Sequence, residues 1–190
     1  KLRGVKPKES GAKAEQLIED LELVDYRDMP VRKLSGGLKR RVLVGIASVA
    51  RPPVMVLDEP TTGLDIQSRR NLWSVLRRSR EEGAFIMLTT HSMEEVETLC
   101  DRVGIIQDGR LLALDTVTKL RADHGFQFKL TYFPDESTRE GVTLYGADDR
   151  ELVARVRDMG FLQFSIGRTT LEDVYLVITG GMDGFDDREG

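Results

Sequence analysis

Apolar side chains recur with the period of a helix in three stretches of the first hundred residues. The spacing predicts helices over 10–24, from Ser35 to the proline pair at 52–53, and over 66–82. Ser35 can cap the second helix, and the prolines end it because proline cannot continue a helix. Gly83 is expected to stop the third helix. The apolar faces consist of Ala14, Leu17, Ile18, Leu21, Leu38, Val42, Ile46, Val49, Leu72, Trp73 and Leu76.

Two short, wholly apolar runs separate these helices from each other and from the following segment. The runs VMVLD (54–58) and AFIML (84–88) are typical of strands that are covered on both faces. A short helix is predicted over 92–99, where Ser92 and Glu95 match a capping box. Helices that alternate with buried strands indicate an α/β fold.

The second half of the chain has a different pattern of apolar and polar residues. Two apolar runs around the Asp-Gly pair at 108–109 predict a hairpin, and after about residue 118 alternating strands surround a helix, as in a small α+β unit. The segment LEDVYLVIT at 171–179 has a mixed pattern and is either irregular or helical. The tail is acidic and rich in glycine, which is typical of disorder. The predicted organisation is a first domain over 1–118, an α+β accessory domain over 119–179 and a disordered tail over 180–190.

Composition narrows the classes of function. The 28 Lys and Arg residues are outnumbered by 32 Asp and Glu, so the formal net charge is −4 and nucleic acid is not expected as a partner. The only cysteine, Cys100, excludes a disulfide framework and favours a reducing cytoplasm. No apolar run reaches the roughly 18–20 residues that span a bilayer. The chain begins with Lys1 rather than Met, which we interpret as a piece of a longer protein.

Two carboxylates follow directly where the first apolar strand ends. Ligands of open α/β sheets gather at the carboxyl ends of strands. There Asp58 could hold Mg²⁺ against phosphate oxygens, and Glu59 could deprotonate an attacking water. In the alternative interpretation, Asp58 only caps a turn and Glu59 is solvated.

Other candidate residues lie at a helix start and at a second strand end. Ser35, Gly36 and Gly37 open a helix, and the N–H groups of such an end can bind an anion. His91 follows the second apolar strand and could reach a phosphate or a water. Each feature also has an ordinary interpretation, as a helix cap or as a bystander histidine, and Asp65 could simply be the N-cap of the third helix.

The four features occur in one order, and together they resemble the ATPase subunit of ATP-binding cassette (ABC) transporters. LSGGL at 34–38 resembles the signature motif, VMVLDE at 54–59 the Walker B motif and GLD at 63–65 the D-loop, while His91 resembles the switch histidine. The resemblance implies a P-loop NTPase-like α/β fold, made of a helical signature subdomain and the back half of a mostly parallel sheet.

In that family two cassettes sandwich two ATP molecules head to tail. The resemblance implies that the turn at 35–37 binds the γ-phosphate of an ATP held by the opposite subunit. It makes Asp58 part of the Mg²⁺ shell, directly or through water, and Glu59 the general base. It implies that His91 positions the γ-phosphate and the water, and that Asp65 couples the two sites.

Two residues depart from the family pattern, and one motif is missing. Leu38 stands where the signature usually ends in Gln, and Ile66 stands where the D-loop is usually followed by Pro. No G-x-x-x-x-G-K-[ST] phosphate loop occurs in the sequence. We therefore expect a chain truncated at its N-terminus, whose ATP binding on its own is weak.

The resemblance also implies partners, and competing functions stay open. An exporter-type subunit, with ATP as substrate and Mg²⁺ as cofactor, would pair with a second ATPase subunit and dock on a separate permease at the cytoplasmic face of a membrane. The end of the α+β unit, TLEDVYLVITG, resembles the accessory domain of such subunits. Alternatives are a non-transport cassette protein acting on ribosomes or DNA, and a catalytically inert regulatory fragment. A single signature motif and the absence of heptads favour the transporter.

Overall fold

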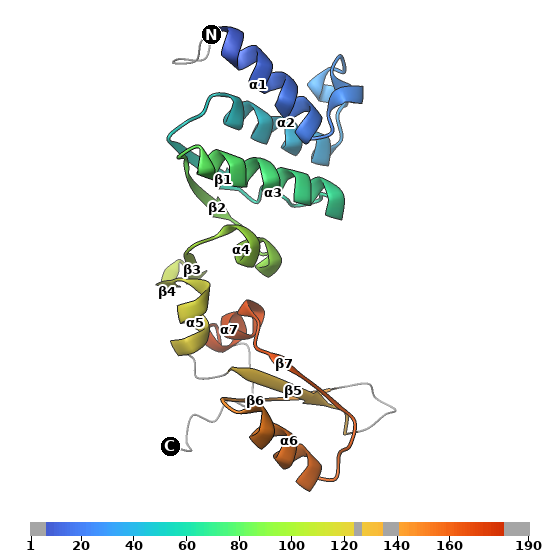
Figure 1. Ribbon diagram of the computed structural model, residues 1–190, viewed down its shortest axis with the longest axis vertical. Coiled ribbons are helices and arrows are strands. Elements are labelled where there is room, and N and C mark those ends of the chain that lie inside the picture. Colours follow the sequence, from blue (N-terminus) through green and yellow to red (C-terminus); the bar gives the residue numbers. More distant parts are fainter. Residues whose placement is uncertain (1–6, 124–126, 135–140, 181–190) are drawn as a thin grey trace. The chain divides into compact units, whose positions relative to one another are not determined.

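The computed structural model describes residues 7–123, 127–134 and 141–180 (Figure 1). The chain divides into two compact units, an N-terminal unit over residues 1–95 and a C-terminal unit over residues 96–190. Within the described ranges no helix is long and apolar enough to cross a membrane. The predicted tail falls almost wholly on 181–190, outside the described residues. The predicted domain boundary near residue 118 stays a prediction.

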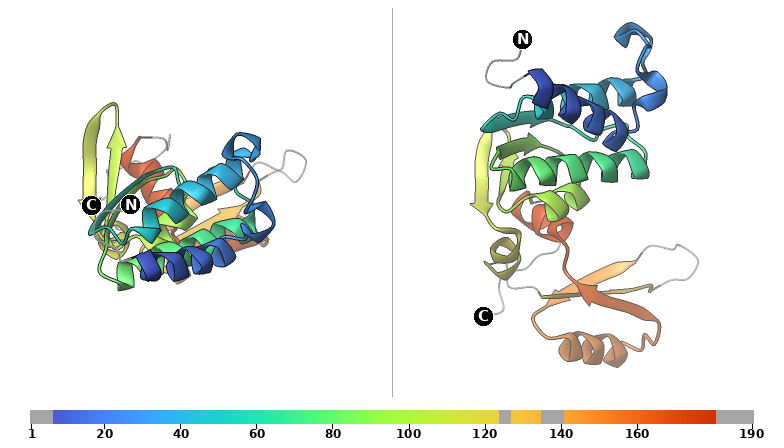
Figure 2. Two further views of the ribbon diagram at one scale, coloured as in Figure 1. Left: turned by 90° about the horizontal axis from the view of Figure 1, so that it is seen from above. Right: turned by 45° about the horizontal axis from the view of Figure 1, so that its top comes forward.

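Three helices build most of the N-terminal unit and pack against one another (Figures 1 and 2). Two of them begin at the predicted caps: Ser35 Oγ accepts from the Leu38 N–H at 3.3 Å, and Asp65 accepts from Ser68. Leu21, one of the predicted apolar positions, lies fully buried. The helices are α1 (Pro7–Asp20), α2 (Gly36–Val49) and α3 (Ile66–Glu81), and two 3₁₀ turns, η1 (Val24–Tyr26) and η2 (Val31–Lys33), join α1 to α2.

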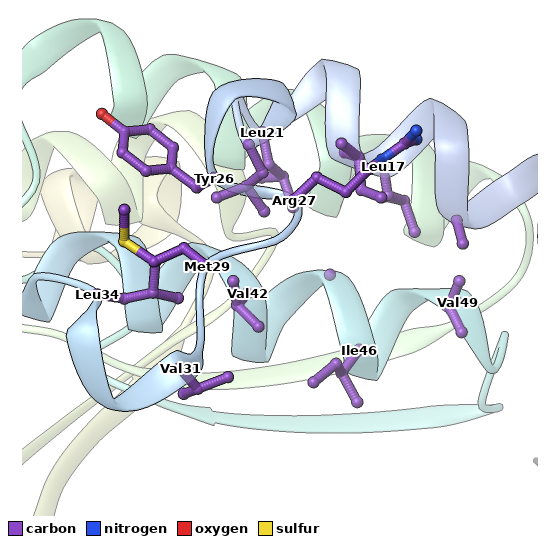
Figure 3. A pocket seen from close by; sticks show the side chains of 14 residues that line it. Leu17, Leu21, Tyr26, Arg27, Met29, Val31, Leu34, Val42, Ile46 and Val49 are labelled. Carbon is purple, nitrogen blue, oxygen red and sulfur yellow. The ribbon is translucent and has the colours of Figure 1, made fainter.

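An apolar pocket of about 300 Å³ lies between α1, α2 and the segment with the two 3₁₀ turns (Figure 3). Ile46 of α2 lines this pocket and is 58% exposed, although the sequence places it on the apolar face of the helix. Leu17 from α1 and Met29 from the connecting segment line it as well. The apolar face of α2 is therefore covered only in part by the described residues.

The central strands of the N-terminal unit are parallel and in register. Strand β1 (Val54–Asp58) pairs with β2 (Phe85–Thr89), and α3 connects them. Met55 is buried on one face, but the apolar side chains of the other face are 53% to 67% exposed. The prediction that both faces are covered is therefore wrong for this chain, because nothing in the described residues covers the second face. Its exposed side chains are Val54, Val56, Phe85 and Met87.

Helix α4 (Met93–Leu99) follows β2 and begins in the N-terminal unit. Ser92 Oγ accepts from the Glu95 N–H at 3.3 Å, as the predicted capping box requires. The Glu95 side chain does not complete the box, because its carboxylate accepts from Trp73 instead. Only half of the predicted cap is therefore formed.

The C-terminal unit begins with a hairpin and continues as a small antiparallel sheet. The hairpin turns at Asp108 and Gly109, which both have positive φ, as the two-residue turn requires. In the sheet β5 lies between β6 and β7, and Leu130 and Tyr132 of β5 pack against α6. The elements are β3 (Val103–Gln107), β4 (Arg110–Asp115), α5 (Val117–Asp123), β5 (Phe128–Tyr132), β6 (Val142–Gly146), α6 (Asp149–Asp158), β7 (Phe164–Arg168) and α7 (Leu171–Ile178).

Asp173 attaches α7 to this sheet. Its carboxylate accepts from Lys129 Nζ at 2.8 Å and from the Tyr145 hydroxyl at 3.0 Å, and it forms a complete capping box with Thr170. Burial alone would raise the pKa of Asp173, but the hydrogen bonds from Lys129 and Thr170 outweigh it and lower that pKa. Burial, followed by the bond to Asp173, raises the pKa of Tyr145.

Candidate active site

The carboxyl ends of β1 and β2 meet at one edge of the parallel sheet. Asp58 and Thr89, the last residues of the two strands, are partners in the register. Thr89 Oγ1 donates to Asp58 Oδ1 at 2.5 Å. The Glu59 N–H then donates to the Thr89 carbonyl at 3.1 Å, which extends the pairing by one residue. The strand pairing thus fixes the backbone that carries both predicted carboxylates.

Glu59 and His91 form a direct pair. His91 Nδ1 lies 3.0 Å from Glu59 Oε1 and 2.9 Å from Oε2, and Thr62 Oγ1 donates to Oε2 at 2.8 Å. The hydrogen bond with His91 is the main cause that lowers the pKa of Glu59, partial burial opposes it, and the bond from Thr62 assists. The His91 ring is 76% exposed, so solvent reaches the pair. Glu59 is therefore an ionised, accessible carboxylate at neutral pH.

The backbone at Glu59 adopts an uncommon conformation. Its φ is +46°, in the left-handed region that few residues other than glycine occupy. The Arg40 guanidinium, from the second turn of α2, donates to the Glu59 carbonyl oxygen. Such backbone positions cost free energy and persist where neighbouring groups hold them. Arg40 therefore links the helix that follows the Ser-Gly-Gly turn to the predicted base.

The Ser35-Gly36-Gly37 turn lies at the exposed start of α2. A Cβ on Gly36 would meet nothing within 4 Å, whereas a Cβ on Gly37 would lie 3.1 Å from Leu64 Cδ2. The turn therefore packs closely against the loop at 63–65 and leaves its outer side open. No hydrogen bond in the described ranges joins this turn to the side chains of Asp58, Glu59 or His91.

Asp65 is engaged as a helix cap. Its Oδ1 accepts from the Ser68 N–H at 2.9 Å and its Oδ2 from the Ser68 hydroxyl at 2.7 Å. These two bonds, the backbone one first, lower the pKa of Asp65. The capping role that the sequence left open is thus present in the structure, while the coupling role stays a prediction.

The donor set at the strand ends fits a cation that binds mainly phosphate and water. The described residues contain no group of three or more His, Cys, Asp or Glu side chains that could hold a metal ion by themselves. Asp58 is exposed, and Thr89 occupies only its Oδ1. A single carboxylate oxygen beside bound phosphates suits Mg²⁺, which keeps several waters and uses one or two protein carboxylates.

Three residues of the site were not predicted from the sequence: Arg40, Thr62 and Thr89. Thr89 could have been found, because the last residues of two parallel strands in register must lie side by side. Thr62 follows Glu59 by three residues in a loop, and Arg40 is an ordinary polar position of a helix. Neither position carries a periodic signal.

Comparisons with known proteins agree with this geometry. The sequence profile of the family described as "ABC transporter" matches residues 2–62. A solved chain titled "Structure of ATP binding subunit of ABC transporter" superimposes with a TM-score of 0.59 at 27% identity, over 64% of this chain and 50% of that chain. The α/β fold is thus that of an ABC ATP-binding subunit.

Curated relatives extend the match along the sequence. "Nod factor export ATP-binding protein I" of Burkholderia lata is 37% identical over 93% of this chain and 64% of its own length. "ATP-binding cassette sub-family A member 7" of Rattus norvegicus is 35% identical over 100% of this chain and 10% of its own length. "ABC transporter A family member 3" of Arabidopsis thaliana is 49% identical over 55% of this chain and 11% of its own length.

The chain therefore spans between 10% and 64% of the length of these relatives. Family profile, curated relatives and solved structure agree on one assignment. The sequence and the fold of this chain match a part of the nucleotide-binding domain of ATP-binding cassette proteins.

Proposed function

We propose that this chain provides the hydrolytic half of an ATP site in a subunit that powers membrane transport. The observation that carries the proposal is the meeting of Asp58, Glu59 and His91 at the ends of β1 and β2. In this proposal Glu59 is the base, His91 orients it, and Asp58 is the carboxylate that binds the cation. All three side chains then face the position of one phosphate. ATP is the substrate.

Glu59 is the general base in this proposal. Its lowered pKa keeps the carboxylate ionised at neutral pH. It accepts a proton from a water whose oxygen bonds to the γ-phosphorus, and the bond from that phosphorus to the bridging oxygen breaks to release ADP. His91 and Thr62 hold the carboxylate in place. Mg²⁺, when bound beside Asp58, neutralises negative charge on the phosphate oxygens.

The turn at 35–37 serves the ATP of a second subunit. The start of α2 presents backbone N–H groups and the positive end of the helix dipole to an anion. Its outer side is open at Gly36, so a phosphate can approach the backbone closely. Asp65 caps α3 beside this turn, and we propose that it couples the two sites of a homodimer. The composite site then requires two copies of the subunit.

The partner is a separate membrane permease that works as an exporter. The Burkholderia lata relative is named as an export ATP-binding protein, which supports this direction. The subunit then works at the cytoplasmic face of the membrane, as a peripheral protein. The α+β domain over 119–179 is its accessory domain, and the net charge of −4 disfavours nucleic acid as a partner.

Replacement of Glu59 tests the proposal. In the subunit that carries this chain, Glu59→Gln keeps the shape of the side chain and removes the base. We expect hydrolysis to fall by at least roughly 10²–10⁴-fold, the contribution of a general base, while ATP binding is retained. Glu81→Gln, at the exposed end of α3, is the matched control. Near-normal turnover of Glu59→Gln would show that Glu59 is not the base.

A further inference from the structure

Two adjacent acidic residues attach α4 to α3. The Glu95 side chain is fully buried, and its Oε1 accepts from Trp73 Nε1 at 3.0 Å. Glu94 forms an ion pair with Arg69 at 3.1 Å at the solvent-exposed edge of the same contact. All four residues belong to the N-terminal unit. The buried pair and the exposed pair therefore act on the same two helices.

Glu95 is an unfavourable residue for a buried position. Its second oxygen, Oε2, has no hydrogen-bond partner among the residues that the structure describes. A buried polar atom without a partner lowers the stability of the fold, and an apolar pair of similar size in place of Trp73 and Glu95 would avoid that loss. The carboxylate also does not serve the helix start, because Ser92 alone caps it. Stability therefore does not explain why a carboxylate is buried here.

The hydrogen bond sets the position of two motif residues relative to each other. Helix α3 begins directly after Asp65, and α4 begins two residues after His91. Apolar packing alone allows a short helix to rotate or slide, whereas a hydrogen bond is directional. The His91 ring itself is largely exposed, so few contacts of its own can hold it. Its reach to Glu59 depends on where α4 begins.

We propose that Trp73 and Glu95 are positioning residues that hold the start of α4, and with it His91, at the distance from Glu59 that their pairing needs. Because the same bond joins α3 to α4, His91 and the helix that Asp65 caps move together. The consequence for hydrolysis rests on the proposed function, but the placement of His91 can be measured without any hydrolysis.

Nuclear magnetic resonance of the ¹⁵N-labelled 190-residue chain tests this placement. The chain has one tryptophan and two histidines, so His124→Gln assigns the ring signals of His91. With the Glu59 carboxylate as acceptor, the neutral His91 ring must carry its proton on Nδ1. Two-bond ¹H–¹⁵N spectra at neutral pH distinguish this tautomer from the Nε2–H form. Glu59→Ala, at a position outside α3 and α4, removes the acceptor and provides the reference spectrum of His91 without that carboxylate.

Two variants break the buried bond from opposite sides. Trp73→Phe keeps an aromatic ring in the core and removes the N–H, and Glu95→Leu removes the acceptor. We expect both to lose the Nδ1–H signature of His91 and to approach the Glu59→Ala spectrum. Glu95→Gln keeps an oxygen for Trp73, and Glu94→Gln breaks only the exposed pair, so both should retain the wild-type spectrum.

The indole N–H signal of Trp73 provides an internal check. It should exchange slowly with solvent in the wild type and in Glu95→Gln, and faster in Glu95→Leu. The His91 spectrum of one of the two variants, Trp73→Phe or Glu95→Leu, is sufficient for the test, provided that this variant folds. A folded variant with an unchanged Nδ1–H signature would overturn the proposal. An Nδ1–H signature that is absent from the wild type as well would instead count against the His91–Glu59 pair, and hence against the proposed function.

Discussion

Glu59 is held by residues from three separate segments of the chain. His91 follows the second strand, Thr62 lies in the next loop, and Arg40 lies on α2. The strand-end rule predicted the two carboxylates and His91, because residues after parallel strands meet at one edge. It could not predict Arg40 or Thr62, since which long or polar side chain reaches a carbonyl or a carboxylate depends on packing that no periodicity records.

Replacement of Thr62 tests whether its hydrogen bond helps to position the Glu59 carboxylate. Thr62→Val keeps the shape of the side chain and removes the hydroxyl that donates to Glu59 Oε2. We expect kcat for ATP to fall with little change in KM, by less than the roughly 10²–10⁴-fold that loss of a general base causes. Thr62→Ser, which keeps the hydroxyl, should hydrolyse ATP almost normally. Equal rates for Val and Ser would exclude a role for this hydrogen bond.

At the scale of elements, local signals predicted the starts of α2 and α3 and the hairpin turn, but α1 runs from Pro7 to Asp20 and not over 10–24 as predicted. The caps at Ser35 and Asp65 and the turn at 108–109 appear as expected, because each depends on neighbouring residues alone. Whether other residues cover one face of a strand or both cannot be deduced from its own sequence, because an apolar run such as 54–58 has the same pattern in either case. The segment 171–178, whose pattern was mixed, is helical because Asp173 both caps it and binds Lys129 on the sheet.

The attachment of α7 predicts a pH dependence of stability. A lowered pKa means that Asp173 stabilises the fold fully above its unfolded value of 3.8, and that this contribution is lost as pH falls through the lower folded pKa. Asp173→Asn should cost roughly 2 kcal/mol at pH 7, as for a hydrogen bond to a charged group. Urea denaturation at pH 7, 4 and 3 should show the difference from wild type shrinking on acidification. A constant difference would contradict the assignment.

At the scale of the whole molecule, the order of four short motifs is what points to the family. Each motif alone has an ordinary explanation, and it is their spacing that is specific. The fold agrees with that assignment, and the A-family relatives align with this chain over 10% to 22% of their length.

The isolated chain should bind ATP·Mg²⁺ weakly. In the proposed site the turn at 35–37 and the strand-end carboxylates contact only the outer phosphate, whereas a G-x-x-x-x-G-K-[ST] loop, which supplies most phosphate contacts, does not occur in this sequence. Isothermal titration calorimetry of the 190-residue chain should detect little or no binding at micromolar ATP. A dissociation constant in the micromolar range would mean that these residues form a nucleotide site of a different kind.

In the proposed dimer, Glu59 of one subunit and Ser35 of the other act on the same ATP. Ser35→Arg blocks closure of a site, whereas Glu59→Gln lets a closed site trap ATP unhydrolysed. Dimers of differently tagged subunits can carry both lesions on one subunit, or one lesion on each. If the site is shared, the first arrangement traps one ATP per dimer and the second traps none, and bound nucleotide counted after rapid gel filtration shows which occurs. The reverse pattern, with trapping only when the lesions are on different subunits, would show that Glu59 and Ser35 of the same subunit act on one ATP and that the site is not shared.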